Sequence, residues 1–275
     1  IVRYNMISHL NKILKPSFAT GDAMRQVEYI GNNTYIIGTG SGKLVRLENE
    51  NFTELYNCGA PVISMMRDRK NFVWVSTAGK GVLVLDNRGK IIHHYNATSG
   101  TRNSLLSNFT REALQVSDSL YIVAGEHNLN LINIYTGAID HITTNEGLPN
   151  NTVYSMQLDQ NNMVWMSTNE GITSYDYTHN EFRMYDEKDG FLPVSNNSDL
   201  LYRSCILHDG RLVFAGAGKY IIFQPDSLVQ RRAPKDVTIT DIRLFNEFLP
   251  VDSILKENGL HLQHDQNTLT INFTS

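Results

Sequence analysis

Nine histidines and two cysteines could bind a metal ion or carry acid–base and nucleophilic chemistry. His93 and His94 are adjacent, so on a strand their side chains would face opposite sides and could not ligate one ion. The other histidines are scattered, and no His-x-x-x-His or Cys-x-x-Cys spacing occurs. Cys205 lies in an apolar run, which predicts a buried, inert thiol. The sequence therefore predicts neither a metal site nor a cofactor.

Recurring aspartates are the next candidates for chemistry, because paired carboxylates can cleave a glycosidic bond. Asp68, Asp86, Asp159 and Asp176 each fall between two apolar runs, where an Asp side chain typically accepts hydrogen bonds from turn backbone. The glycine-rich residues 38–42 lead into a strand-like run, so they lack the helix N-terminus that binds phosphate. Turn chemistry explains these residues better than catalysis, and no catalytic residue is predicted.

The apolar runs that flank these aspartates belong to an internal repeat. Residues 63–86 align with residues 153–176, and Ser64, Trp74 and Thr77 of the earlier copy each have an identical residue 91 positions later. The residues that mark the ends of the second runs are Thr39, Thr77, Gly125, Thr168 and Gly216. Their spacings of 38, 48, 43 and 48 average about 44 residues, the length of one four-stranded propeller blade.

The repeat predicts an all-β fold. Short apolar or alternating runs bounded by Gly, Asn and Asp are typical of strands, and a further run closes most units, at 90–95, 139–142 and 181–185. No segment has the 3.6-residue periodicity of a helix. One aromatic residue recurs in the second run of four units: Trp74, Tyr121, Trp165 and Phe214. We expect these aromatic side chains to fill the space between neighbouring sheets of a β-propeller.

Charge and hydropathy exclude several classes of protein. Lys plus Arg number 24 and Asp plus Glu 28, giving a formal net charge of −4. That balance provides no basic surface for nucleic acid or an acidic membrane. No stretch reaches the roughly 18 apolar residues of a transmembrane helix.

The repeat resembles a known family. The pattern Asp-x-x-x-x-(Leu/Val)-Trp-(Val/Met)-Ser-Thr-x-x-Gly-(Ile/Val)-x-x-(Tyr/Leu)-Asp resembles the two-component-regulator propeller repeat, most closely over residues 151–193. That stretch includes the linking phrase Asp-Gly-Phe-Leu-Pro at 189–193, and residues 146–149 carry a sister phrase. Residues 233–246 and 262–273 resemble the first strands of the triple-tyrosine (YYY) domain. Only two of five units keep the Trp, which is a departure from the family pattern.

The resemblance implies a periplasmic sensor ectodomain of a Bacteroidetes-type hybrid two-component system. Residues 1–23 would then be the remnant of a preceding blade, and residues 24–232 would form about five blades, part of a seven-bladed ring. Residues 233–275 would begin an immunoglobulin-like YYY sandwich. The resemblance further implies an oligosaccharide ligand, a homodimer through the YYY domain, an upstream propeller of the same protein as a partner, and an anchor in the inner membrane. The kinase would lie outside this chain, and no nucleic acid would bind here.

Loops that depart from the repeat are the predicted ligand site. The unit 108–150 departs most, with Arg111 where other units have Ser, and His127 and Asn128 where others have a short turn. The predicted site also contains Arg102, Asn169 and Glu170. Arg, His and Asn suit a polar or anionic sugar, because Arg can bind a carboxylate or sulfate through two hydrogen bonds. Ordinary solvated loops, a protein-binding scaffold, and a propeller lyase or glycosidase remain the alternatives.

Overall fold

The computed structural model describes residues 2–4, 11–14, 22–98, 103–149, 152–191, 203–216, 219–228, 238–245, 247–249 and 262–274. The chain divides into two compact units, Ile1–Pro225 and Asp226–Ser275. In its described part the first unit contains four four-stranded sheets, a three-stranded sheet and a two-stranded hairpin of β1 (Val2–Tyr4) and β2 (Asn11–Ile13). No helix among the described residues is long and apolar enough to cross a membrane.

Each four-stranded sheet is an antiparallel meander whose strands lie in chain order. The first sheet contains β3 (Met24–Gly31), β4 (Thr34–Thr39), β5 (Lys43–Glu48) and β6 (Asn51–Asn57), and the second contains β7 (Val62–Arg67), β8 (Val73–Thr77), β9 (Val82–Leu85) and β10 (Ile91–Tyr95). The third contains β11 (Thr110–Gln115), β12 (Leu120–Gly125), β13 (Leu129–Asn133) and β14 (Ile139–Ile142), and the fourth contains β15 (Val153–Leu158), β16 (Val164–Thr168), β17 (Gly171–Asp176) and β18 (Glu181–Tyr185). The fifth sheet contains β19 (Arg203–Ile206), β20 (Leu212–Gly216) and β21 (Lys219–Phe223).

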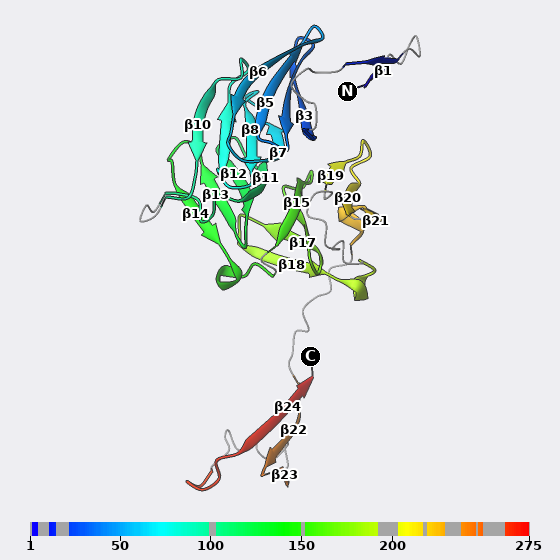
Figure 1. Ribbon diagram of the computed structural model, residues 1–275. Coiled ribbons are helices and arrows are strands. Elements are labelled where there is room, and N and C mark those ends of the chain that lie inside the picture. The colour runs from blue at the N-terminus through cyan, green and yellow to red at the C-terminus, as the bar shows by residue number, and fades with distance from the viewer. Residues whose placement is uncertain are drawn as a thin grey trace. The chain divides into compact units, whose positions relative to one another are not determined.

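The sheets are arranged as propeller blades. Their first strands contact one another in the order β3, β7, β11, β15 and β19 around a common centre, and the fourth strands β6, β10 and β14 lie at the outside (Figure 1). The only helical elements among the described residues are the 3-10 turns η1 (Thr144–Glu146), η2 (Glu187–Asp189) and η3 (Pro225–Ser227). The predicted all-β fold of four-stranded blades is therefore confirmed, and β14 and β18 have the predicted bounds.

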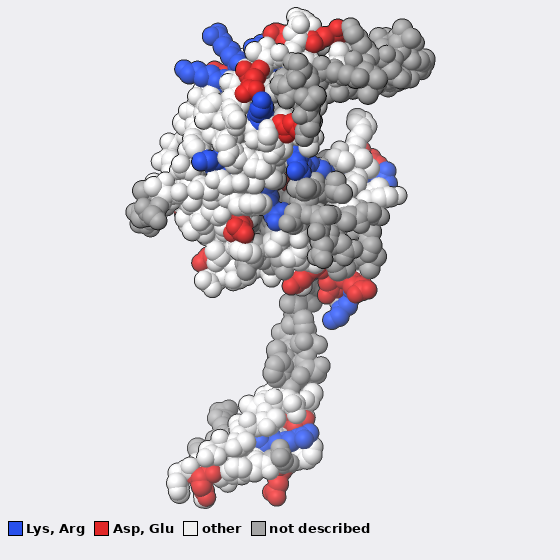
Figure 2. Space-filling view, viewed as in Figure 1, with Lys and Arg blue, Asp and Glu red and all other residues white. Residues whose placement is uncertain are grey.

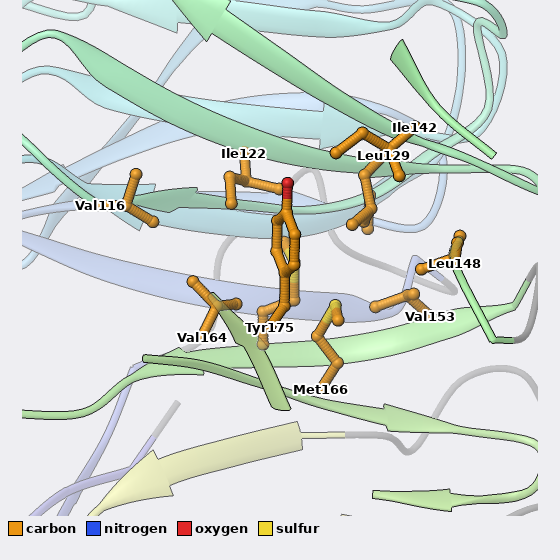
Figure 3. Close-up of a cluster of buried hydrophobic side chains, with 11 residues drawn as sticks. Val116, Ile122, Leu129, Ile142, Leu148, Val153, Val164, Met166 and Tyr175 are labelled. Atoms are coloured by element: carbon orange, nitrogen blue, oxygen red, sulfur yellow. The ribbon is translucent and has the colours of Figure 1, made fainter. Parts of the chain in front are cut away.

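Apolar side chains fill the space between neighbouring sheets. Figure 3 shows the cluster between the third and fourth sheets, in which Ile122 and Leu129 approach Tyr175 and Met166 from the opposite sheet. All four side chains are buried, with at most 1% of their surface exposed. At about 25 cal/mol per Å² of buried apolar surface, such inter-sheet contacts are the main stabilising contribution of the fold. Each sheet therefore depends on its neighbours for stability.

The recurring aromatic side chains alternate between two faces. Trp74 lies three residues before the end of its strand, whereas Tyr121 lies four residues before the end of β12. Because successive side chains on a strand point to opposite faces, Trp74 points toward the following sheet and Tyr121 toward the preceding one. The two rings consequently stack, with centroids 4.1 Å apart. The expectation that Tyr121 occupies the same position as Trp74 is therefore wrong by one residue.

The same alternation occurs at the next tryptophan. Trp165 and Phe223 meet between the fourth and fifth sheets with ring centroids 5.0 Å apart, and Phe214 stacks against Phe223 at 6.1 Å. Trp165 lies three residues before the end of β16, whereas Phe214 lies two residues before the end of β20. All four recurring aromatic side chains are buried.

Hairpin aspartates fix the tryptophans. Asp159 Oδ1 accepts hydrogen bonds from the backbone N–H groups of Asn161 (2.8 Å) and Met163 (2.9 Å), while its Oδ2 accepts from Trp165 Nε1 at 2.8 Å. Asp68 binds its own hairpin and Trp74 Nε1 (3.1 Å) in the same way. The predicted turn role of these aspartates is confirmed, and the indole contact explains why Asp and Trp keep a six-residue separation.

The links between sheets also contribute to the core. Thr143 and Asp186 each begin a 3-10 turn with a capping box, and Gly147 (φ 101°) and Gly190 (φ 88°) end these turns. Such positive φ values favour glycine. The next residues, Leu148 and Phe191, are buried between neighbouring sheets. The linking phrases in the sequence therefore encode a turn followed by an apolar residue of the inter-sheet core.

The ends of the first unit differ from its middle. Leu14 packs against Ile37 and Val45 on the side of the first sheet that faces away from the second. On the fifth sheet, Cys205 pairs with Val213 and is exposed, so the prediction of a buried thiol is wrong. The physical reason is that Cys205 points away from the fourth sheet, while Ser204 contacts that sheet.

The second unit contains a three-stranded antiparallel sheet of β22 (Thr238–Leu244), β23 (Glu247–Leu249) and β24 (Leu269–Thr274), in the order β23-β22-β24. Asn272 Nδ2 donates to both carboxylate oxygens of Asp241, at 2.9 and 3.0 Å, and Arg243 Nε donates to the same carboxylate at 2.9 Å. This sheet lies in the stretch that resembles the YYY domain. The assignment to that domain and the boundaries 1–23, 24–232 and 233–275 stay predictions.

Candidate ligand-binding site at the loop end of the third and fourth sheets

Arg111 lies between two aromatic rings. Its guanidinium carbon is 5.3 Å from the ring centroid of Phe109 and 5.1 Å from that of Tyr154 in the next sheet. The Tyr154 hydroxyl donates a hydrogen bond to Asn169 Oδ1. Cation–π contacts of this kind help to hold a guanidinium in place. The cluster Phe109, Arg111, Tyr154 and Asn169, here called the arginine cluster, is the candidate site.

A β-bulge places Arg111 and Tyr154. The pairing of the first and second strands skips one residue between Thr110 and Glu112, and likewise between Val153 and Ser155. A bulged residue has no partner across the ladder, so its side chain can be aimed away from the regular alternation. Arg111 and Tyr154 are therefore structurally equivalent residues.

The first two sheets have the same bulge, at Arg25 and Ile63. Each of the four four-stranded sheets thus presents one bulged residue near the start of its first strand, and the type of that residue varies from sheet to sheet. The ladder matches Ser64 and Ser155 with Glu112, because all three pair with the residue just before the end of the second strand. The expectation that Arg111 replaces Ser is therefore wrong by one residue.

The β12–β13 loop contains two predicted site residues, and their side chains have different environments. His127 is exposed and has a positive φ of 65°. Asn128 is 3% exposed: its Nδ2 donates to Glu126 O at 2.6 Å, and its Oδ1 accepts from Asn130 Nδ2 at 2.7 Å. The Asn128 side chain consequently stabilises its own loop, while His127 faces solvent.

Asn169 and Glu170 form the β16–β17 loop. The Glu170 backbone N–H donates to Thr168 Oγ1 at 3.2 Å, and both side chains are exposed. Together with Met184 and Lys188 they line a shallow hollow beside the fourth sheet. Of the predicted residues, the structure brings Arg111 and Asn169 together through Tyr154, while Arg102 lies outside the described residues. Sequence reasoning missed Phe109 and Tyr154, although Tyr154 aligns with the apolar Ile63 and could have been noticed as a change at that position.

Polar side chains join the first strands where they surround the common centre. Glu112 Oε2 accepts a hydrogen bond from the Met156 backbone N–H at 2.6 Å, and the equivalent Gln26 donates to Met65 O at 2.9 Å. Arg203 on β19 donates to Ile63 O on β7 at 2.9 Å. Burial raises the pKa of Glu112 to about 7, although the Met156 N–H and the Arg203 charge oppose the shift. Glu112, the residue after Arg111, thus couples the third and fourth sheets.

The described surface carries mixed charge. On the face seen in Figure 2, acidic and basic side chains are interspersed, and most of the described surface is neither. Among the described residues, no group of three or more His, Cys, Asp or Glu side chains could hold a metal ion. The site therefore offers aromatic surface, one guanidinium and amide groups.

Comparisons with known proteins agree with this architecture. Residues 147–170 match the model of the two component regulator propeller family. The curated relative "Histidine kinase P4" of Formosa agariphila is 23% identical in an alignment 237 residues long, which covers 74% of this chain and 17% of that protein. This chain thus spans about a sixth of that relative's length.

Solved structures share the fold. The extracellular domain of the putative hybrid two component system BT3049 from B. thetaiotaomicron superposes with a TM-score of 0.70 at 21% identity, covering 99% of this chain and 38% of that one. The WD40 β-propeller domain of Doa1 superposes with a TM-score of 0.53 at 13% identity, covering 72% of this chain and 62% of that one. The chain is therefore a β-propeller protein that carries a two component regulator propeller repeat at residues 147–170.

Proposed function

We propose that this chain is a ligand-sensing segment of a hybrid two-component regulator and that the arginine cluster binds an oligosaccharide with an acidic group. The observation that carries the proposal is that Arg111 lies between the rings of Phe109 and Tyr154. Arg111 and Tyr154 are the bulged residues of two adjacent sheets. The family match and the similarity to an extracellular domain of such a system support the sensory role.

The cluster has the chemistry that an acidic sugar requires. Aromatic rings can pack against the C–H face of a sugar ring, and a guanidinium binds a carboxylate or sulfate through two parallel hydrogen bonds. Because two rings already hold Arg111, less conformational entropy is lost when a ligand binds. The exposed Asn169 and Glu170 add polar groups for sugar hydroxyls.

Signalling would require that the dimer has two arrangements with different affinities for the ligand. The segment would lie in the periplasm as part of a protein anchored in the inner membrane, dimerise through the C-terminal sheet and adjoin an upstream propeller of the same protein. A bound sugar would favour one arrangement of the dimer over another, because a ligand shifts an equilibrium only by its difference in affinity. No bond is broken in this segment, and the kinase would lie outside it.

A protein-binding scaffold is the second candidate. Tyr220 (71% exposed) and Ile222 (43% exposed) lie on β21 and present apolar surface to solvent. Exposed apolar side chains of this kind often mark contacts with another protein. This surface is separate from the arginine cluster, so the two functions can be tested independently.

Isothermal titration calorimetry with neutral, carboxylated and sulfated oligosaccharides tests the proposal. We expect saturable binding of an acidic member, and we expect Arg111→Gln to weaken it by about 1.5–3 kcal/mol, the contribution of a hydrogen bond to a charged group. Arg88→Gln, in the β9–β10 hairpin, is the matched control and should leave the affinity unchanged. Absence of binding across the panel, or equal affinity of the Arg111 variant, would contradict the proposal.

A further inference from the structure

A second polar hollow lies at the other end of the same strands. The arginine cluster is at the start of β11 and β15, whereas this hollow of about 620 Å³ is formed where β15 and β19 end. It is lined by residues of three hairpins, each joining the first and second strands of a sheet. Arg69 follows β7, Leu158 ends β15 and is followed by Gln160 and Asn162, and Ile206 ends β19 and is followed by His208. A volume of this size lies within the range of small-molecule sites. We call it the hairpin pocket.

Several polar side chains of the hairpin pocket have no partner within the described part of the chain. Gln160, Asn162 and His208 make no side-chain hydrogen bond or ion pair with another described residue. The neighbouring carboxylates differ: Asp159 accepts from its hairpin and from Trp165, and Asp209 pairs with Arg211 at 2.8 Å. The acidic groups are therefore engaged, while amide and imidazole groups remain available to a ligand.

Arg69 supplies a cation at the rim. Its backbone N–H donates to Gln115 Oε1 at 2.8 Å, which fixes the hairpin tip. Its guanidinium is 3.4 Å from Asp118, and the two side chains are 56% and 80% exposed. An exposed pair at that distance contributes little, so the guanidinium can exchange Asp118 for a ligand carboxylate at low cost.

We propose that the hairpin pocket is a second binding site, for a small hydroxy-carboxylate such as a uronate. Arg69 would bind the carboxylate. Gln160, Asn162 and His208 would bind hydroxyl groups, since each can both donate and accept a hydrogen bond. Leu158 and Ile206 provide an apolar surface for the C–H groups of the ligand. This site does not depend on the proposed function of the arginine cluster.

Titration of the 275-residue chain with four probes tests this proposal. Glucuronate carries the carboxylate and the hydroxyls on a ring, gluconate carries them on an open chain, glucose lacks the carboxylate, and acetate lacks the hydroxyls. We expect glucuronate to bind at least about tenfold more tightly than glucose or acetate, because only it engages both kinds of group. The affinity of gluconate relative to glucuronate reports how far the pocket selects the ring.

Variants locate the binding. Arg69→Gln and Gln160→Ala should each weaken glucuronate binding by about tenfold. Lys70→Gln is the matched control, because Lys70 is adjacent but its Nζ contacts Tyr135, 4.6 Å from the ring centroid. The same titrations in an Arg111→Gln background, in which the arginine cluster has lost its guanidinium, separate the two sites, and glucuronate should still bind in that background. Failure of glucuronate to bind the Arg111→Gln chain, equal affinity for acetate, or full affinity after Arg69→Gln is added to that background would each overturn the proposal.

Discussion

The third and fourth sheets have the same four-stranded topology, but the polar partners of their aromatic side chains differ. In the fourth sheet, Asp159 fixes Trp165 within its own sheet. The third sheet has no Trp in β12, and its Tyr121 hydroxyl instead donates to Asp68 of the second sheet at 2.9 Å. The fourth sheet thus follows the repeat closely, whereas the third is joined to its neighbours by polar contacts.

The same sheet carries the unusual residues of the candidate site. At the position where the second and fourth sheets have Ser64 and Ser155, the third has Glu112, which reaches across to β15. Its bulged residue is the charged Arg111. Departures from the repeat therefore coincide with contacts between sheets and with the proposed ligand site, which is where function is expected to lie.

The largest expected effect comes from Asp68. Asp68→Ala removes the acceptor of two backbone N–H groups, Trp74 Nε1 and the Tyr121 hydroxyl, so we expect a loss of about 3–5 kcal/mol in the free energy of unfolding. As far as the structure describes the chain, Asp159 makes the corresponding contacts only within its own sheet, so Asp159→Ala should lose about 2–3 kcal/mol in the free energy of unfolding. Urea denaturation of both variants measures the difference.

The partly buried hairpin residue Asp86 provides the control for this pair. Among the described residues, its carboxylate accepts hydrogen bonds only from the backbone N–H groups of Arg88 and Lys90, so Asp86→Ala should lose about 1 kcal/mol. Equal destabilisation by the Asp68 and Asp159 substitutions would show that the contact between the second and third sheets adds no stability.

Glu112 should make the junction of the third and fourth sheets dependent on pH. Its folded-state pKa of about 7 lies above the usual value of 4.5, so the folded chain binds the proton more tightly than the unfolded chain. The free energy of unfolding should therefore fall as pH rises through this interval, by about 1–3 kcal/mol between pH 4.5 and 7.5. Glu112→Gln should remove this contribution, measured as the difference between the two proteins' unfolding curves at each pH. A pH dependence identical in the two proteins would exclude Glu112 as its source.

The smallest effect concerns one hydroxyl. Tyr121→Phe removes the donor to Asp68 and leaves the ring stacked on Trp74, so we expect a loss of about 1–2 kcal/mol. Tyr175→Phe is the matched control: its hydroxyl donates to Asn180 at 3.2 Å in a partly buried position and should lose about 0.5–1 kcal/mol. Thermal unfolding of the two variants compares them. A control that is destabilised more than Tyr121→Phe would contradict the special role given to the Asp68 contact.

The strands were predictable because their causes are local. Alternation of apolar and polar residues, with Gly, Asn or Asp at the turns, defined runs such as 139–142 and 181–185, and these coincide with β14 and β18. The turn role of Asp159 was equally predictable, because an Asp side chain bonds to backbone within a few residues of itself. Its bond to the Trp165 indole was not predictable from the turn alone.

The wrong predictions arise from strand register and from the face of the sheet on which a side chain lies. A bulge shifts the ladder by one residue, so Arg111 aligns with Tyr154 and not with Ser155, and no turn residue signals that shift. Cys205 lies in an apolar run, yet it is exposed because its face of the fifth sheet points away from the fourth sheet. Asn128 stays a predicted ligand contact, and the structure adds that its amide is hydrogen-bonded within its own loop.

The sequence by itself determined the all-β class, the repeat of about 44 residues and the hairpin aspartates, since each depends on residues near one another in the chain. Tertiary structure alone decided which side chains meet across sheets: Trp74 with Tyr121, Glu112 with Met156, and Arg111 with Tyr154. These contacts join residues about one repeat apart, and their geometry depends on strand register and bulges. A change of one residue in register moves a side chain to the opposite face, so the site became visible only once the sheets were assembled.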